Sequence, residues 1–457
     1  MNWNQLLLQE RFKSSSVIKD ETDGRNIFDN DYSRMSLSPH VRRLQNKAQV
    51  FPLEKTDFSR NRLTHSLEVS SFAKSLGLGI EQQLIKENKL DSKLKGFIPS
   101  ILQTSGLIHD IGNPPFGHFG EETIQRFFSK YFKSNKEKYS TFTKEEKLDF
   151  LKFDGNVQGF RILRKLGLSD NEFGYNLTLP TLASVIKYPA SSFEGNKDDK
   201  NQISKKKFGY FQSEKEDYKI INEKLGLNGK RHPLVFILEV ADDVAYSVCD
   251  IEDGFRKKII SKDFLIDELE KLLKNTENKK FIEELKEINK NVRKDHPARD
   301  EVIIQKFRIK VQSFMLIEGT KAFIKYHDDI LNGSFDKDLL LSSEAAELRK
   351  AFKKLSYINF QHRSVLKREL IGERVISFLM EQLINAVTNE EKLSNPKSKE
   401  AKLNALISPS YKFVNEVLKT YPNEEYNKIQ LVTDYVSGMT DTFALNLFRE
   451  LMGHKME

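Results

Sequence analysis

Chemically useful side chains are most concentrated in residues 107–122, which read Leu-Ile-His-Asp-Ile-Gly-Asn-Pro-Pro-Phe-Gly-His-Phe-Gly-Glu-Glu. The apolar run 97–108 predicts a helix that ends in the adjacent pair His109 and Asp110, where a Gly-Asn-Pro-Pro turn stops it. A neutral imidazole beside a carboxylate suits a borderline divalent cation. A His-Asp pair alone is weak evidence because composition produces it by chance in many chains, so a metal site needs further ligands.

Two other segments supply candidate ligands. Residues 61–69 open a second amphipathic helix, which carries His65. Its expected buried stripe consists of Leu63, Leu67, Phe72 and Ala73. Residues 236–250 form a helix-like apolar run that is interrupted by acids.

The acids of residues 236–250 follow a helical spacing. Asp242, Tyr246 and Asp250 lie at i, i+4 and i+8, so one helical face presents them together. Carboxylates among so many apolar neighbours are costly to bury unless a cation or hydrogen bonds compensate. We therefore expect Asp242 to be a metal ligand and the adjacent Asp243 to support the ligands indirectly.

The predicted metal ligands are His65, His109, Asp110 and Asp242. Two imidazoles and two carboxylates leave coordination positions open for water and a phosphate oxygen. Each residue alone is more often an ordinary core or surface residue, and only the combination indicates a metal site. The order of His, then His-Asp, then Asp resembles that of the HD phosphohydrolase superfamily.

The resemblance extends to one family of that superfamily. The chain is similar to the deoxyguanosine triphosphate triphosphohydrolases, HD enzymes that release tripolyphosphate from deoxynucleoside triphosphates. The matching segments follow the family's order along nearly the whole chain and are residues 42–53, 62–65, 109–121, 153–159, 186–189, 207–211, 239–253 and 434–441. Thr442 departs from the pattern, because relatives commonly have a basic residue there; this leaves the role of the C-terminal segment open.

His118 and Glu121 are the predicted catalytic residues. They are three residues apart, so they can meet on one helical turn. A carboxylate beside an imidazole orients the ring and holds its proton, which suits general acid or base catalysis. The resemblance assigns the pair to the α-phosphorus, where water attacks and the 5′-hydroxyl of the nucleoside leaves. A structural hydrogen bond is the alternative role for His118.

The charge of the chain indicates polyanionic partners. Its net charge is +8 and its pI is about 9.0, which fits a triphosphate pocket, a nucleic-acid surface or simply a solvated lysine-rich surface. The resemblance makes Arg62, Lys187 and Lys207 the candidates for the triphosphate oxygens. For Lys205 and Lys206 a solvated loop is the better interpretation.

The resemblance also implies residues for the nucleoside. Tyr246 would lie against the sugar, where its ring leaves little room for a 2′-hydroxyl, and Asp250 would accept a hydrogen bond from the 3′-hydroxyl. Gln49 can donate and accept at the sugar or base edge. Further pocket candidates are Asn113, Asn156 and Gln158, although turn capping explains Asn113 equally well.

The composition predicts a soluble cytoplasmic protein. Hydrophobic residues are 38% and charged residues 31% of the chain, and no run of eighteen apolar residues exists. The N-terminus lacks the apolar core of a secretory signal. Cys249 is the only cysteine, which fits a reducing compartment.

The fold is expected to be all-α, with an HD-domain helical core and an additional helical C-terminal portion. Residues 1–33 should form an irregular N-terminal arm that docks on a neighbouring subunit, and residues 34–260 the HD core. Residues 261–457 should complete the fold and make oligomer contacts. Helical spacing is clearest over residues 262–288, 301–324 and 373–386, and loops are expected at 189–204, 291–300 and 389–399.

The leading prediction is metal-dependent hydrolysis of a deoxynucleoside triphosphate, with dGTP and water giving deoxyguanosine and tripolyphosphate. The cation is expected to be Mn²⁺ or Mg²⁺. One alternative is an HD phosphohydrolase for other nucleotides, including cyclic ones; another is a regulator that responds to nucleotides or nucleic acid. The resemblance implies a homo-oligomer such as a hexamer, and nucleotides or single-stranded nucleic acid are candidate effectors.

Overall fold

The computed structural model describes residues 1–14, 22–53, 58–167, 171–198 and 202–454. Within these ranges it contains twenty-two α-helices, several short 3-10 and π-helical turns, and no strand beyond two isolated bridges. The prediction of an all-α fold is confirmed. Among the same residues, no helix is both long and apolar enough to cross a lipid bilayer.

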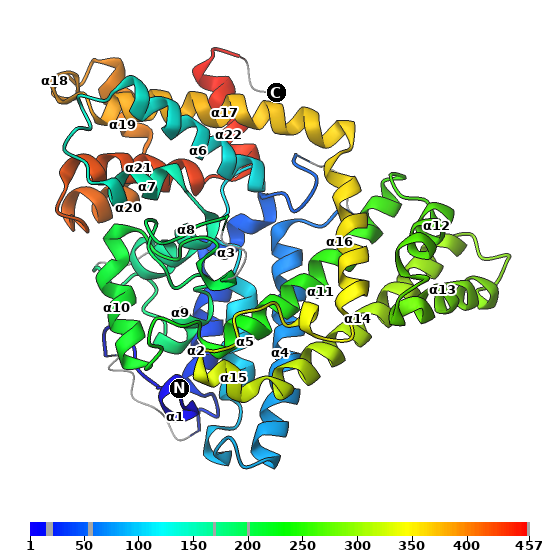
Figure 1. The fold of residues 1–457 in the computed structure, drawn as a ribbon. Coiled ribbons are helices and arrows are strands. Elements are labelled where there is room, and N and C mark those ends of the chain that lie inside the picture. Colours follow the sequence, from blue (N-terminus) through cyan, green and yellow to red (C-terminus); the bar gives the residue numbers. More distant parts are fainter. Residues whose placement is uncertain (15–21, 54–57, 168–170, 199–201, 455–457) are drawn as a thin grey trace.

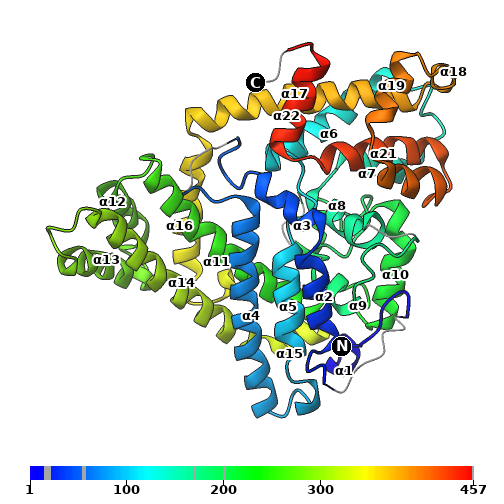
Figure 2. The ribbon, with the colours of Figure 1, turned by 180° about the vertical axis from the view of Figure 1, so that it is seen from behind.

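Three helices near the centre of the molecule carry the candidate metal ligands (Figures 1 and 2). They are α4 (Arg62–Lys86), α5 (Phe97–Ile108) and α11 (Pro233–Arg256). Asn61 caps α4 by accepting a hydrogen bond from the N–H of Thr64, as the opening of a helix at residues 61–69 predicts. Helix α11 begins at Pro233, three residues before the predicted run 236–250, because proline fits the first turn of a helix.

Helices α4 and α5 pack closely because small residues face each other. A Cβ atom placed on Gly106 would lie 2.6 Å from Cα of Ser70, and one placed on Gly77 would lie 2.9 Å from the backbone of α5. Only residues without a large side chain permit this approach. The packing brings the start of α4 beside the end of α5.

The buried face of α4 differs from the predicted stripe. Leu67 is 46% exposed, Leu63 and Phe72 are only partly buried, and Ala73 alone of the four is fully buried. The buried face is turned so that the small residues Ser70, Ala73 and Gly77 lie on it, as the close approach of α5 requires. The residues buried on this helix are Arg62, His65, Ser66, Val69, Ser70, Ala73, Leu76, Gly77, Ile80, Glu81 and Leu84.

Helices from the second half of the chain pack against the central helix α11 and against α6. Helix α11 packs against α14 (Arg299–Lys325) and α16 (Ala346–Phe360), while α17 (Arg363–Val387) packs against α6 (Gly117–Ser134). Helices α12 (Lys262–Leu273) and α13 (Lys280–Asn291) project from the side of the molecule in Figures 1 and 2. The other helices are α1 (Trp3–Leu6), α2 (Ile27–Ser36), α3 (Pro39–Arg43), α7 (Lys144–Leu151), α8 (Gly155–Arg161), α9 (Leu179–Ser184), α10 (Lys215–Lys224), α15 (His327–Asn332), α18 (Glu390–Leu393), α19 (Lys399–Leu406), α20 (Pro409–Lys412), α21 (Glu424–Ser437) and α22 (Asp441–Leu451).

The described part of residues 1–33, predicted to be an irregular arm, includes regular helix. It contains α1 and most of α2, and Trp3 is buried. The Met1 amino group donates to the carbonyl oxygen of Leu331 at 2.9 Å, and Trp3 Nε1 donates to His327 Nε2 at 3.1 Å. The beginning of the chain therefore docks on its own α15.

Some predicted boundaries also move. The helical pattern over residues 262–288 is interrupted because buried Asn278 bonds to the Glu344 carbonyl and the Leu348 N–H, each at 3.0 Å. The expected loop 389–399 contains α18, and α14 already starts at Arg299. Residues 199–201 of the expected loop 189–204 lie outside the described residues, and the rest of it is irregular apart from a short 3-10 turn that starts at Ile203.

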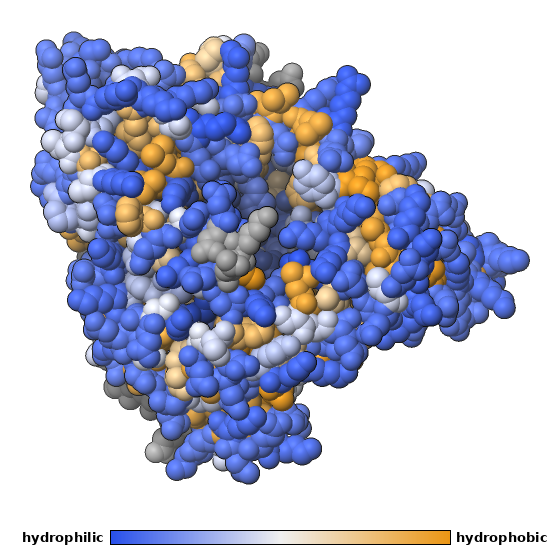
Figure 3. Space-filling view, viewed as in Figure 1, coloured by the Kyte–Doolittle hydropathy of each residue, from blue (hydrophilic) through white to orange (hydrophobic). Residues whose placement is uncertain are grey.

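Most of the face seen in Figure 3 is hydrophilic, and its exposed apolar residues form small separate groups. The same face is hollowed near its centre, between the part that contains α17 and the part that contains α16 (Figures 1 and 3). The hollow lies in front of the central helices.

A buried ion network joins the two halves of the chain. Arg161, at the end of α8, is fully buried, and its Nη2 lies 2.8 Å from Oδ2 of Asp434 in α21. Its Nη1 lies 2.6 Å from Oε1 of Glu214, which is also fully buried. Removing one partner of such a network leaves an uncompensated charge in the interior.

We predict that Arg161→Met lowers the free energy of unfolding by about 3–5 kcal/mol, because two buried carboxylates lose their cation. Urea unfolding followed by circular dichroism measures this. Lys350→Met is the matched control, since Lys350 forms a half-exposed pair with Glu347 and should cost less than about 1 kcal/mol. Equal losses in the two variants would contradict the prediction.

Candidate metal centre and substrate cavity

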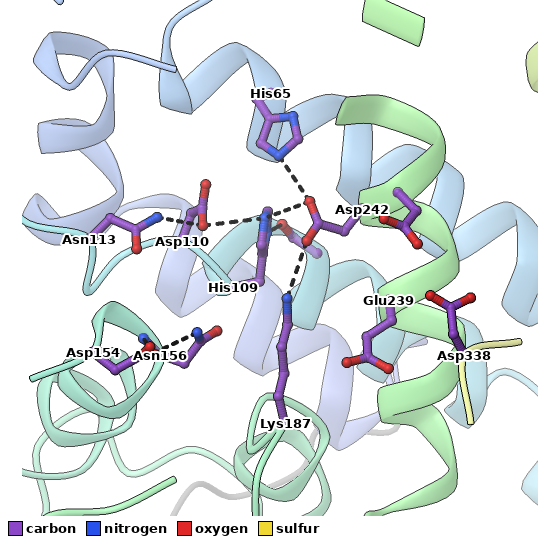
Figure 4. A network of polar contacts seen from close by, with 12 residues as sticks. His65, His109, Asp110, Asn113, Asp154, Asn156, Lys187, Glu239, Asp242 and Asp338 are labelled. Carbon is purple, nitrogen blue, oxygen red and sulfur yellow. Dashed lines mark hydrogen bonds and ion pairs between the residues drawn. The ribbon is translucent and has the colours of Figure 1, made fainter. Parts of the chain in front are cut away.

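His65, His109 and Asp242 converge from the three central helices. His65 Nε2 lies 3.2 Å from Asp242 Oδ1, and His109 Nε2 lies 3.5 Å from the same oxygen. One ligand atom from each residue lies within 4.8 Å of the other two. Figure 4 shows the two rings and the carboxylate pointing toward one another. The structure therefore brings three of the four predicted ligands together.

The hydrogen bonds of His109 test whether a cation fits this cluster. Its Nδ1 lies 2.8 Å from the carbonyl oxygen of Gly106, which can only accept, so Nδ1 carries the proton. Nε2 is buried and makes no hydrogen bond within the described residues. A buried imidazole lone pair aimed at a carboxylate, with the ring fixed by a backbone carbonyl, fits a divalent metal ligand.

Asp110 lies beside this cluster but is engaged elsewhere. Its Oδ1 is 3.6 Å from His109 Nε2 and accepts a hydrogen bond from Asn113 Nδ2 at 2.6 Å. Its Oδ2 lies 2.6 Å from Nη1 of Arg62. Burial would raise the pKa of Asp110, but His109 and Arg62 lower it below the ordinary value. Its role as a fourth ligand stays a prediction.

The structure distinguishes the two adjacent acids of α11. Asp243 faces α16, where Arg349 Nη2 lies 2.9 Å from its Oδ2 and 3.0 Å from Oδ2 of Asp338. Asp242 instead faces the histidines, and Lys187 Nζ lies 3.2 Å from its Oδ2 (Figure 4). The expectation that Asp242 and not Asp243 shares the metal cluster agrees with this geometry.

We predict that Asp242→Asn abolishes stoichiometric Mn²⁺ binding, because the anionic ligand between the two imidazoles is lost. Asp243→Asn is the matched control and should retain Mn²⁺, since its carboxylate is already held by Arg349. Metal content after dialysis and the melting temperature of each variant check this. Loss of Mn²⁺ from Asp243→Asn with retention in Asp242→Asn would make Asp243 the ligand.

The predicted catalytic pair also forms. His118 and Glu121 lie about one turn apart near the start of α6, with His118 Nδ1 3.2 Å from Glu121 Oε2. Glu121 is buried, and its Oε1 accepts a hydrogen bond from the N–H of Gly155 at 2.8 Å. The His118 side chain is 73% exposed, so Nε2 can reach a ligand from the solvent side.

The charges of this pair stabilise each other. Burial would raise the pKa of Glu121, but His118 and Lys207 lower it to about 2, so the carboxylate is ionised at neutral pH. The same carboxylate raises the pKa of His118 above its ordinary value. An exposed imidazole whose protonated form is stabilised by a neighbouring carboxylate is suited to general acid catalysis.

A cavity of about 380 Å³ adjoins the catalytic pair. Tyr246 lines it one helical turn after Asp242, and its ring stacks on Phe360 with a centroid distance of 6.4 Å. Gln49 lines the cavity too, and its Oε1 has no hydrogen-bond partner within the described residues. The residues around the cavity are Ala48, Gln49, Val50, Pro52, Phe116, Gly117, His118, Phe119, Glu122, Tyr246, Tyr357, Phe360, Gln361, Leu366 and Glu369.

Two lysines from the predicted set lie near the metal cluster and the catalytic pair: Lys187 beside Asp242, and Lys207 close enough to Glu121 to lower its pKa. Lys187 contacts Asp242, and Lys207 pairs with Asp154, the residue that caps α8. Burial alone would lower the pKa of each lysine. Neighbouring carboxylates, Asp242 for Lys187 and Asp154 for Lys207, raise both pKa values above the ordinary value, so both ammonium groups stay charged.

The remaining predicted residues are less accessible. Asp250 is buried one turn beyond Tyr246 and does not line the cavity. Burial raises the pKa of its carboxyl group, and its Oδ2 has no hydrogen-bond partner within the described residues. Gln158 is fully buried and donates to Asp434 at 3.0 Å, so it belongs to the Arg161 network. Asn156 donates to Asp154 at 2.8 Å.

Sequence reasoning missed the contribution of α16 and α17 to the cavity. Tyr357, Phe360 and Gln361 come from the end of α16 or just after it, and Leu366 and Glu369 come from α17. These residues lie more than a hundred positions after Tyr246 and form no spacing typical of a ligand site. Only the packing of α16 against α11 brings them to the cavity.

An all-α core in which two histidines and an aspartate converge in this order defines an HD-domain protein. The HD domain family matches residues 62–246, which include all three converging ligands.

Sequence comparison with known proteins identifies the family within the HD-domain proteins. The chain is 37% identical to a deoxyguanosinetriphosphate triphosphohydrolase-like protein of Listeria innocua, with 99% of this chain and 100% of the relative aligned. It is 35% identical to a protein of that description from Synechocystis, with 99% of each chain aligned. It is 30% identical to a deoxyguanosinetriphosphate triphosphohydrolase of Klebsiella pneumoniae, with 98% of each chain aligned. The chain therefore belongs to the deoxyguanosinetriphosphate triphosphohydrolase family of HD-domain phosphohydrolases.

Proposed function

We propose that the protein is a divalent-metal-dependent deoxynucleoside triphosphohydrolase, with dGTP as its favoured substrate. It would convert dGTP and water into deoxyguanosine and tripolyphosphate. The main support for the proposal is that α11 contributes both to the metal cluster and to the cavity beside it. Asp242 belongs to the metal cluster, and Tyr246, one turn later, lines the cavity that also holds His118.

The metal cluster and the two lysines form the triphosphate half of the site. His65, His109 and Asp242, with Asp110 as the proposed fourth ligand, would hold a divalent cation, which would supply positive charge to polarise phosphate oxygens. Lys187 and Lys207 add fixed ammonium groups, which neutralise charge as it moves toward the tripolyphosphate. Arg62 is a weaker candidate for a phosphate oxygen, because Asp110 already engages one end of its guanidinium group.

His118 and Glu121 provide the proton for the leaving group. Water attacks the α-phosphorus, its oxygen stays on the tripolyphosphate, and one of its protons is released to solvent. The bond from phosphorus to the 5′-oxygen breaks, that oxygen takes a proton from Nε2 of His118, and His118 regains a proton from solvent before the next turnover. Glu121 holds Nδ1 of the same ring, so the proton on Nε2 faces the substrate. The buried position of Glu121 keeps the ring in this orientation.

The cavity provides the nucleoside half of the site. The stacked pair Tyr246 and Phe360 offers a flat apolar surface to the deoxyribose, and the unpaired Gln49 oxygen can accept a hydrogen bond from the sugar or base edge. Asp250 is proposed to bind the 3′-hydroxyl once substrate opens a path to it. Asn113 would shape the phosphate side through its bond to Asp110.

Product analysis tests the proposal directly. The protein would be incubated with Mn²⁺ and each of the four deoxynucleoside triphosphates separately, with cyclic nucleotides and ribonucleotides in parallel. We expect tripolyphosphate and the free nucleoside, fastest from dGTP. Pyrophosphate with a nucleoside monophosphate, or activity on cyclic nucleotides alone, would contradict the proposal.

The pH dependence of turnover follows from the acid role of His118. Activity requires the protonated ring, so kcat is full below the pKa of His118 and falls as pH rises through it. In Glu121→Gln the carboxylate that raises this pKa is gone, so the fall should begin at lower pH. Measuring kcat between about pH 6 and pH 9 in both proteins checks the shift.

His118→Ala is the companion variant. It should lower kcat about 10²-fold or more and flatten the alkaline fall, with Mn²⁺ content and nucleotide affinity near those of the unaltered protein. An unchanged alkaline fall in either variant would assign the titration to another group.

Sugar selectivity tests the position of Tyr246. Tyr246→Ala should reduce discrimination against GTP relative to dGTP, because the ring that crowds a 2′-hydroxyl is removed. Tyr246→Phe keeps the ring and its stacking on Phe360, so it should keep the discrimination. The ratio of kcat/KM for the two nucleotides is the measurement. An equal ratio in all three proteins would exclude the ring as the source of selectivity.

Other properties of the family stay proposals for this chain. We propose a cytoplasmic homo-oligomer such as a hexamer, with contacts made by residues 261–457. Nucleotides and single-stranded nucleic acid remain candidate effectors, supported by the net charge of +8. The boundaries at residues 33 and 260 are likewise predictions.

A further inference from the structure

The junction between α21 and α22 reaches the catalytic cavity from the far end of the chain. Asp441, the first residue of α22, is buried, although charged residues usually lie on the surface. Its Oδ1 accepts a hydrogen bond from the N–H of Phe116 at 2.9 Å, and its Oδ2 accepts one from the N–H of Ala48 at 3.0 Å. One carboxylate thus joins two backbone segments that are distant in sequence.

Each of these backbone segments carries a residue of the proposed site. Phe116 lies two positions before His118, and Ala48 immediately precedes Gln49. Phe116 and Ala48 themselves line the cavity. A small change in either peptide would therefore move a side chain that faces the substrate.

The conformation of Phe116 needs an external constraint. Its φ of 63° lies in the left-handed region, which a bulky residue rarely adopts. Phe116 stands at the start of α6, and its own side chain provides no capping hydrogen bond. Its ring packs over Gly372 of α17, where a Cβ atom would lie 2.6 Å from the ring. The bond to Asp441 and this packing together hold the peptide that starts the helix of His118.

Lys47 ties the same segments a second time. It is buried, and its Nζ donates to the carbonyl oxygen of Asn113 at 2.5 Å and to that of Ser437 at 3.1 Å. Ser437 is the last residue of α21, and Asn113 lies in the turn before Phe116. Lys47 and Asp441 thus connect the same three segments through separate hydrogen bonds. These segments are the junction of α21 and α22, the turn before α6 and the segment that carries Gln49.

Capping of α22 does not explain the Asp441 carboxylate. Thr440 already caps that helix by accepting a hydrogen bond from the N–H of Phe443 at 3.2 Å. Both Asp441 oxygens point away from α22, toward the cavity segments. The carboxylate is therefore available for positioning the site.

We propose that Asp441 is a positioning residue, which fixes His118 and Gln49 relative to each other through the N–H groups of Phe116 and Ala48. This inference rests on the proposed function for its effect on turnover. It assigns a role to the C-terminal segment that needs no basic residue at position 442.

The test compares Asp441→Asn with the matched control Thr440→Ala. Asparagine presents an amide N–H₂ to one of the two backbone donors, so one hydrogen bond must break. Thr440→Ala weakens the start of α22 but leaves both carboxylate bonds in place. Hydrogen exchange at the amides of residues 48 and 116 reports the bonds themselves, independent of any catalytic activity.

We expect exchange at one or both of these amides to rise about 10-fold or more in Asp441→Asn, the factor that corresponds to losing one hydrogen bond of about 1.4 kcal/mol. Thr440→Ala should leave both amides protected. The kcat values are measured with a nucleotide that the unaltered protein hydrolyses. Relative to that protein, kcat of Asp441→Asn should fall about 10-fold or more at unchanged Mn²⁺ content, while kcat of Thr440→Ala should change by less than about 2-fold.

Three outcomes would overturn the proposal: protected amides in Asp441→Asn, equal exposure in both variants, or raised exchange with unchanged kcat. If the unaltered protein hydrolyses none of the nucleotides, the proposed function fails, while the exchange data still decide whether the carboxylate holds the two peptides. Should Asp441→Asn not fold, Asp441→Glu keeps the charge but displaces the carboxylate by one methylene group. It should raise exchange at the same amides in a folded protein, and unchanged exchange there would equally overturn the proposal.

Discussion

The carboxylate of Asp242 is the interaction on which the rest of the site depends. It lies between His65 and His109 and also contacts the ammonium group of Lys187. Burial alone would raise the pKa of Asp242, but Lys187 and His109 lower it well below the ordinary value. A carboxylate held ionised among two imidazoles and an ammonium group is prepared for a cation and for the oxygens of a polyphosphate.

The close packing of α4 on α5 makes this convergence possible. Gly106 and Ser70 let the two helices approach until the start of one lies beside the end of the other. Larger side chains at these positions would separate His65 from His109 by moving their helices apart. The same approach places both rings under α11, which packs against α4 and α5 and supplies Asp242.

Several charged side chains near the metal cluster form ion pairs with each other. The residues left to bind a cation are therefore a small, defined set. Arg349 holds Asp243 and Asp338, Arg231 pairs with Glu239 at 3.0 Å, and Lys207 pairs with Asp154. These partners remove Asp243, Asp338, Glu239 and Asp154 from competition for the cation, while Lys207 keeps its charge. Their hydrogen-bonded partners offset the desolvation free energy of burying these ions.

The sequence predicted those features that depend on local pattern. The helix end before His109, the capped start of α4 and the i, i+4 face of Asp242 and Tyr246 all follow from spacing and turn residues. The short spacing of His118 and Glu121 likewise predicted their contact.

Features that depend on tertiary packing could not be predicted in this way. Of the predicted stripe of α4 only Ala73 is fully buried, because the close approach of α5 at Ser70 and Gly77 decides which face of the helix turns inward. The docking of Trp3 on His327 could not be predicted because it joins positions more than three hundred residues apart. The partners of Asp441 and the cavity residues of α16 were missed for the same reason, since no local pattern encodes which distant backbone a side chain will meet.

The most direct test of the account is a crystal structure of the protein with Mn²⁺, collected at a wavelength where manganese scatters anomalously. The account predicts one strong anomalous peak per chain, within bonding distance of His65 Nε2, His109 Nε2 and an oxygen of Asp242. A crystal that binds manganese only elsewhere, with His65 still hydrogen-bonded to Asp242 at saturating metal, would contradict it.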